Sequence, residues 1–141
     1  MFVLDTDHIS LMEWSAGLAR QNLLRRLSMV PPDEVFTTIV TYEEQTRGWM
    51  GYAARTRTTA QQIEAYRKLE RHLDLYRRVQ VLGFDERAGA EFERLKKARI
   101  RVGTMDLKIA AIALSHGATV LTRNRGDFEQ VPGLQIEDWT V

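Results

Sequence analysis

The sequence FVLDTDH at residues 2–8 is the clearest indication of the fold. Its apolar part, residues 2–4, stops abruptly at Asp5, which is typical of a buried strand that ends at the polar edge of a sheet. Four further short apolar runs have the same character and occur at residues 35–40, 79–82, 119–122 and 134–136. We therefore predict four to five short strands.

Segments with helical patterns separate these runs. We expect helices over residues 7–12, 18–27, 41–52, 85–98 and 106–115, and a long one that opens at residue 59. Asp7 and Thr59 are the expected caps of two of them. The long helix has an apolar face at helical spacing, made by Ile63, Tyr66, Leu69, Leu73 and Tyr76. Residues 106–115 are nearly all apolar, so this helix should be buried.

Short apolar strands that alternate with helices predict an α/β domain with three layers, α/β/α, around a mainly parallel sheet of four to five strands. The 141 residues fit one domain over positions 1–141. Hydrophobic residues make up 44% and charged residues 28% of the chain, which is enough apolar material for a packed core and argues against intrinsic disorder.

The composition excludes several kinds of chemistry. The chain has no cysteine, so disulfides, thiolate catalysis and cysteine-ligated zinc are ruled out. The three histidines are scattered without a paired spacing, which makes a zinc site improbable. No basic leader and no long apolar run is present, so we expect a cytoplasmic protein without a membrane partner.

Charge is unevenly distributed along the chain although the formal net charge is only +1. Residues 47–101 carry 14 Lys and Arg against 7 Asp and Glu, and the remainder is acidic. Two readings are open: ordinary amphipathic helices with solvated charged faces, or a basic rim beside an acidic pocket.

Acidic and amide side chains follow the predicted strands. They are Asp5, Glu44, Asp106, Asn124 and Asp127. Each has a local explanation: Glu44 can close a capping box with Thr41, Asp106 lies near a helix N-terminus, and the others suit caps and turns. In an open parallel sheet, however, the carboxyl ends of the strands meet at one edge, where ligands bind. We therefore expect these side chains to converge.

Converging carboxylates repel one another unless they take up protons or bind a cation. Their hard oxygen donors favour Mg²⁺ or Mn²⁺, which suits phosphodiester hydrolysis. Asp5 and Asp106 are then direct metal ligands and Glu44 is a ligand or the base that acts on water. Asn124 or Asp127 would hold a second metal or a bound water. Arg47, Arg123 and Arg125 are candidates for contacts to the substrate phosphates.

Four sequence elements occur in a specific order. They are LDTDH at 4–8, Glu44 with Gly48 four residues later, MDLKIAA at 105–111, and TRNRGDF at 122–128 followed by VPGL at 131–134. Together they resemble the PIN-domain ribonucleases, and most closely the VapC-like toxins of bacterial type II toxin–antitoxin pairs. The similarity extends over nearly the whole chain.

The resemblance implies a Mg²⁺-dependent endoribonuclease that cuts cellular RNA, is neutralised by a cognate VapB-like antitoxin and forms a homodimer. By this analogy, Asp5, Glu44 and Asp106 match the acidic triad. Asn124 lies where many members have a fourth acid, and because an amide adds no negative charge, Asp127 would have to compensate. Thr6 and Thr104 match polar positions that support the site.

Two other functions remain open from the sequence. The run Asp5-Thr6-Asp7 after an apolar strand approaches the opening of haloacid-dehalogenase-like phosphatases, in which Asp5 would be the nucleophile. The later acidic motif of those enzymes is incomplete here, since Val131 stands where an acid would fall. Alternatively, the chain is a non-catalytic module of the same fold that binds RNA or a protein, a reading that only the missing charge at Asn124 supports.

Overall fold

A computed structural model describes all 141 residues and contains one five-stranded sheet. The strands are β1 (Phe2–Leu4), β2 (Val35–Thr38), β3 (Gln80–Leu82), β4 (Thr119–Leu121) and β5 (Gln135–Glu137). Their order across the sheet is β3-β2-β1-β4-β5, and every neighbouring pair is parallel. The predicted α/β fold with a parallel sheet is confirmed.

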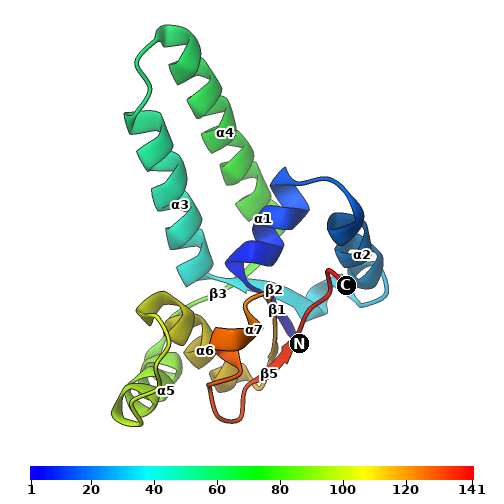
Figure 1. The fold of residues 1–141 in the computed structure, drawn as a ribbon, viewed down its shortest axis with the longest axis vertical. Helices are drawn as coiled ribbons and strands as arrows, with labels where there is room; N and C mark the ends of the chain where they lie inside the picture. Colours follow the sequence, from blue (N-terminus) through cyan, green and yellow to red (C-terminus); the bar gives the residue numbers. More distant parts are fainter.

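Seven α-helices and one short 3₁₀ helix connect the strands (Figure 1). They are α1 (Thr6–Trp14), α2 (Leu18–Leu27), the 3₁₀ helix Pro32–Glu34, α3 (Ile39–Ala54), α4 (Thr59–Arg78), α5 (Glu86–Lys97), α6 (Thr104–His116) and α7 (Arg125–Phe128). The short helix α7 was not expected from the sequence. None of the helices is both long enough and apolar enough to cross a lipid bilayer.

Several predicted boundaries are shifted by local capping. Asp5 rather than Asp7 caps α1, because its carboxylate accepts a hydrogen bond from the backbone N–H of Thr6. Thr58 rather than Thr59 caps α4 and forms the capping box with Gln61. The second strand ends at Thr38 instead of residue 40, since Thr38 accepts from the backbone N–H of Thr41 and so starts α3.

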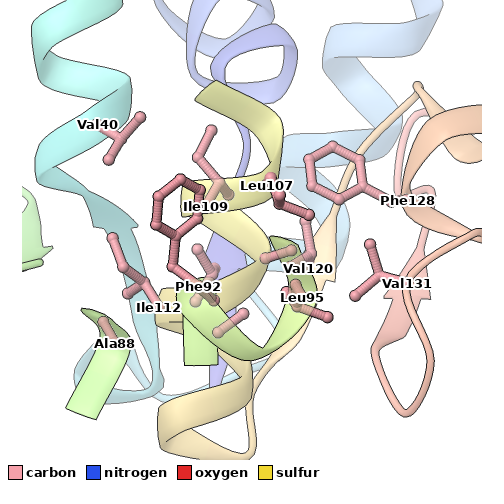
Figure 2. Close-up of a cluster of buried hydrophobic side chains, with 14 of the residues drawn as sticks. Val40, Ala88, Phe92, Leu95, Leu107, Ile109, Ile112, Val120, Phe128 and Val131 are labelled. Atoms are coloured by element: carbon pink, nitrogen blue, oxygen red, sulfur yellow. The ribbon is translucent and has the colours of Figure 1, made fainter. Parts of the chain in front are cut away.

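One face of the sheet is covered by α5 and α6. Val3 of β1 and Val120 of β4 point to this face and pack with Ile109 and Ile112 of α6. Figure 2 shows Val120, Ile109 and Ile112 together with Phe92 and Leu95 of α5, Val40 at the start of α3, and Phe128 and Val131 near the C-terminus. The apolar sequence of α6 therefore has the expected cause: the helix is enclosed between the sheet and α5.

The opposite face is covered by α1, α2 and the C-terminal end of α4. Leu4 and Leu121 point to this side, because neighbouring residues of a strand alternate between the two faces of a sheet. They pack with Ile9 of α1, Leu23 of α2 and Leu75 of α4. The strands are thus apolar on both faces, as parallel sheets buried between helices require.

Helices α3 and α4 form an antiparallel hairpin that extends well beyond the sheet (Figure 1). The prediction for the apolar face of α4 is wrong for most of its residues: Ile63 is 49%, Tyr66 60% and Leu73 51% exposed. The buried residues of this helix are Ala65, His72 and Leu75. Because the hairpin projects into solvent, most of α4 has only α3 to pack against, so a narrow stripe of side chains is covered.

The strand order determines at which edge of the sheet a ligand can bind. Successive strands run outward from β1 to β2 and β3 on one side and from β4 to β5 on the other, so the direction of winding reverses between β1 and β4. In open α/β sheets, ligands bind outside the carboxyl ends of the strands at this point. Asp5 follows β1 and Thr122 follows β4, so both lie at the reversal.

Replacing Ile109 with alanine is expected to lower the free energy of unfolding by roughly 2–5 kcal/mol, because the substitution leaves a cavity in a fully buried layer. The same substitution at the half-exposed Ile63 should change it by no more than about 0.5 kcal/mol. Urea denaturation of both variants measures the difference. Similar losses at the two positions would contradict the packing of α6 described above.

Candidate active site

Asp5 is the most enclosed acid of the site. The residue is 4% exposed. Its Oδ1 accepts a hydrogen bond from the backbone N–H of Thr6 at 2.7 Å, and its Oδ2 accepts one from the hydroxyl of Thr122 at 2.9 Å. Burial raises the pKa of Asp5 from 3.8 to about 7, and the neighbouring charge of Asp7 adds to this shift. Two hydrogen bonds therefore do not offset the cost of ionising this carboxyl group.

Asp7 belongs to the same cluster, although the sequence predicts it as the N-cap of the first helix. Its Oδ2 accepts a hydrogen bond from the backbone N–H of Arg123 at 2.9 Å, and its Oδ1 lies 2.7 Å from Nδ1 of His8. The buried His8 accepts from the backbone N–H of Trp139 through Nε2, so Nδ1 is the atom that donates to Asp7. Thr122 was not predicted as a site residue, and its signal was its place at the polar end of the fourth apolar run, one residue beyond β4.

Glu44 reaches the site from α3. Its Oε1 accepts a hydrogen bond from the hydroxyl of Thr6 at 3.4 Å. Burial raises the pKa of Glu44, with a further contribution from the charge of Asp106. The capping-box alternative for Glu44 is wrong, because Thr38 and not Thr41 caps α3. Its carboxylate is directed to the strand ends instead of the helix N-terminus.

Asp106 lies in the first turn of α6, and Asn124 and Asp127 approach it from the segment after β4. The side-chain nitrogen of Asn124 donates to Oδ2 of Asp106 at 3.3 Å and to Oδ2 of Asp127 at 2.9 Å. Burial raises the pKa of Asp106, and the charges of Asp127 and Asp7 raise it further. The amide of Asn124 thus offsets part of the repulsion between two acids from different elements.

The two threonines expected to support the site differ. Thr6 contacts Glu44 and also lies 3.3 Å from the hydroxyl of Thr41, so it joins α1 to α3 beside the acids. Thr104 is the first residue of α6, is exposed, and makes no side-chain hydrogen bond. The structure therefore brings Thr6 into the cluster and leaves Thr104 at its periphery.

The three arginines proposed as phosphate contacts are exposed around the acids. Arg47 pairs with Glu43 at 2.7 Å, and Arg125 pairs with Glu129 at 3.0 Å. Exposed ion pairs of this kind contribute little free energy and rearrange easily. The side chain of Arg123 forms no ion pair, and its charge helps to lower the pKa of Asp138, while only its backbone N–H contacts Asp7. Their contacts to a substrate stay predictions.

The donor set fits a small divalent cation. The acids offer only hard carboxylate oxygens, and burial raises the pKa values of Asp5, Glu44 and Asp106, so a nearby cation would favour their ionised forms. No three acidic or histidine side chains are arranged to hold one ion together, so the expected convergence of all the acids on one ion is not seen. A Mg²⁺ ion here would use one or two carboxylates and water or phosphate oxygens at its other positions.

Comparison with known proteins gives the family of the chain. The PIN domain family matches residues 3–134, which is nearly the whole chain. The chain belongs to the PIN domain family.

Relatives of this PIN domain carry VapC names. It is 38% identical over 66 residues to the tRNA(fMet)-specific endonuclease VapC of Salmonella typhimurium, a match that covers 44% of this chain and 50% of that protein. It is 32% identical over 114 residues to the ribonuclease VapC1 of Haemophilus influenzae, covering 79% of each chain. The solved structure of VapBC-1 from nontypeable Haemophilus influenzae superposes with a TM-score of 0.75 at 29% identity, over 99% of this chain and 98% of that one.

The raised pKa of Asp5 predicts how stability depends on pH when no divalent cation is present. A carboxyl group whose pKa rises from 3.8 to about 7 on folding stabilises the fold at low pH, and this stabilisation is lost as the pH rises through about 7. Asp5→Asn should remove much of the fall and be more stable than the wild type at about pH 8 by up to a few kcal/mol, at ~1.4 kcal/mol per pKa unit.

Urea unfolding in the presence of a chelator, compared between about pH 5 and about pH 8, measures this effect. Asp74→Asn is the matched control, since Asp74 is exposed on α4 and only pairs with Arg78. Parallel stability curves for the wild type and Asp5→Asn would show that the Asp5 carboxyl group ionises without a penalty.

Proposed function

We propose that this PIN domain is a divalent-metal-dependent endoribonuclease and acts as the toxin of a toxin–antitoxin pair. One observation carries the proposal: hydrogen bonds join acids from separate chain segments at the carboxyl ends of the strands. Thr122 contacts Asp5 and Asp7, Thr6 contacts Glu44, and Asn124 contacts Asp106 and Asp127. The VapC names of its relatives support RNA as the substrate.

In this proposal, Asp5 and Asp106 hold Mg²⁺ or Mn²⁺, and Asp127, which Asn124 joins to Asp106, holds a bound water or a second ion. When bound, such an ion supplies positive charge against the phosphate oxygens and makes water a better nucleophile. Glu44 is suited to orient the attacking water and to accept its proton, because it is only half-buried and Thr6 fixes one of its oxygens.

The other groups at this edge position the acids and the substrate. Thr122 and the backbone of Thr6 hold both oxygens of Asp5, which prevents the carboxylate from rotating away from the site. Asn124 keeps Asp106 and Asp127 together while no cation is bound. Arg123 has an exposed side chain without an ion pair and follows Thr122 directly, so it is a candidate for a phosphate next to the scissile bond.

Partners are part of the same proposal. The resemblance to VapC-like toxins and the fold shared with VapBC-1 support a VapB-like antitoxin that blocks the site. The predicted homodimer and the cytoplasmic location stay predictions.

The phosphatase alternative lacks part of its machinery. Such enzymes need a later acidic motif besides the aspartate nucleophile, and Val131 stands where its second acid would fall. A non-catalytic binding module has no need of buried acids with raised pKa values. Both alternatives are decided by the cleavage experiment below.

We predict that the purified protein cleaves RNA in Mg²⁺ and that Asp106→Asn slows cleavage about a hundredfold or more, because a catalytic metal supplies several kcal/mol and ~1.4 kcal/mol is worth tenfold in rate. A chelator should abolish cleavage, and added Mn²⁺ should restore it. Single-turnover cleavage of total cellular RNA, followed by mapping of the new 5′ ends, gives the rates. Asp74→Asn, an exposed change of the same kind, should cleave like the wild type.

The same variants test the toxin role when they are expressed in a bacterial host. The wild type and Asp74→Asn should arrest growth and produce new 5′ ends, and Asp106→Asn should do neither. Normal growth with intact RNA in all three strains would refute the proposal, as would equal cleavage by the wild type and Asp106→Asn.

A further inference from the structure

A groove of about 420 Å³ opens beside the acids and runs along α1 and α3. Thr6 and Glu44 line one part of it, and Trp14, Trp49 and Tyr52 form an aromatic wall in another part. The volume is in the range of roughly 300–1,000 Å³ that is usual for sites that hold small organic groups. The proposed catalytic site therefore continues into an aromatic groove that the reaction itself does not require.

The aromatic wall is held in place by contacts from its own neighbours. The rings of Trp14 and Trp49 lie 4.6 Å apart between centroids, and those of Trp49 and Tyr52 lie 5.9 Å apart. Lys68 of α4 lies 4.7 Å from the ring of Tyr52, and Arg71 lies 4.2 Å from that of Trp14. Neither cation lines the groove, so both contact the rings from outside it. All three rings are partly exposed.

The floor of the groove is open at Gly48. This glycine lies one helical turn after Glu44 on α3, and a Cβ atom built on it would meet nothing within 4 Å. A glycine inside a helix costs about 1 kcal/mol relative to alanine. Its effect here is to leave bare backbone between the acid of Glu44 and the indole of Trp49, where any side chain would enter the groove.

The charge of the groove changes along its length. Near the strand ends it contains the carboxylate of Glu44, and farther along α3 it contains the exposed guanidinium of Arg55. A second hollow of about 250 Å³ shares Tyr52 and Arg55 with the groove and extends it to Thr56 and Gln61 near the tip of the hairpin. Lys68 adds positive charge behind the wall, whereas Arg71 is paired with Glu13 at 2.7 Å. A polyanion with flat apolar groups complements this surface.

We propose that the groove between α1 and α3 binds a single-stranded RNA segment next to the scissile phosphate, with at least one base stacked on the wall of Trp14, Trp49 and Tyr52. Arg55 contacts a phosphate of that segment. Aromatic rings interleaved with cations are the usual means of holding single-stranded nucleic acid, because every base has a face that can stack. The inference deepens the proposed function and rests on it, since it gives the substrate a strand that is unpaired at the cut.

A peptide segment is the rival occupant of the groove. The wall would suit apolar side chains, but an extended peptide gives no reason for the exposed guanidinium of Arg55 at the far end of the groove. The acids at the near end also require a ligand that brings or tolerates a divalent ion, which a phosphate does. These features favour RNA.

The test compares two ligands of equal charge on a protein that binds without cutting. The Asp106→Asn variant is titrated in Mg²⁺ with a short unstructured RNA oligonucleotide and with an abasic ribose-phosphate oligomer of the same length. Because phosphate contacts are common to both, their affinity ratio reports the bases alone. We expect the RNA to bind at least roughly fivefold more tightly, as one stacked base implies, and to quench tryptophan fluorescence.

Second substitutions locate the stacking. Adding Trp49→Ala should remove most of the preference for RNA, whereas Tyr66→Ala, an aromatic change on the exposed side of the same hairpin, should leave it intact. Gly48→Leu should weaken RNA binding without loss of thermal stability, because leucine is a better helix former. Gly89→Leu in α5, where a Cβ atom also meets nothing, should do neither.

Equal affinities for RNA and the abasic oligomer, or an unchanged preference in Trp49→Ala and Gly48→Leu, would overturn the proposal and favour a peptide occupant. The proposed nuclease function fails separately, by the absence of cleavage in the wild type. A preference for RNA that depends on Trp49 would support the groove proposal even then.

Discussion

The ionisation of Asp5 is the constraint on which the site depends. Its carboxyl group is 4% exposed, has only two neutral hydrogen-bond donors, and lies near the charge of Asp7, so its pKa rises to about 7. A buried carboxylate in this position needs either a proton or a cation. Burial also raises the pKa values of Glu44 and Asp106, and the charge of Asp106 adds to the shifts of Glu44 and Asp5. The divalent ion that we propose would supply the positive charge that favours the ionised acids.

The strand order of the sheet brings these acids close together. The reversal between β1 and β4 places Asp5 next to the segment after β4, and the parallel direction of every strand brings α3 and α6 to the same edge. The apolar packing of α6 against the sheet fixes Asp106, and hydrogen bonds from Thr6 and Thr122 fix the other acids. Stability and function thus use different residues of the same helices: Ile109 packs inward while Asp106 faces the site.

The sequence was sufficient for the strands, for most helices and for the acids, because apolar runs and strand-end acids are local signals. It was insufficient where contacts between residues far apart in the sequence determine capping, burial or membership of the site. The capping explanation for Glu44 could not be rejected until Thr38 was known to cap α3. The apolar face of α4 was predicted from its spacing, yet much of it is exposed because the hairpin leaves the body of the domain. Asp7 and Thr122 joined the site through contacts more than a hundred residues apart in sequence.

Calorimetric titration with Mg²⁺ in buffers of different ionisation enthalpy tests the central claim most directly, because it counts the protons that are released when the ion binds. The account predicts binding with net proton release near neutral pH, less release at higher pH, and little release in Asp5→Asn. Binding that releases no protons at any pH, or the same release in the wild type and Asp5→Asn, would contradict it.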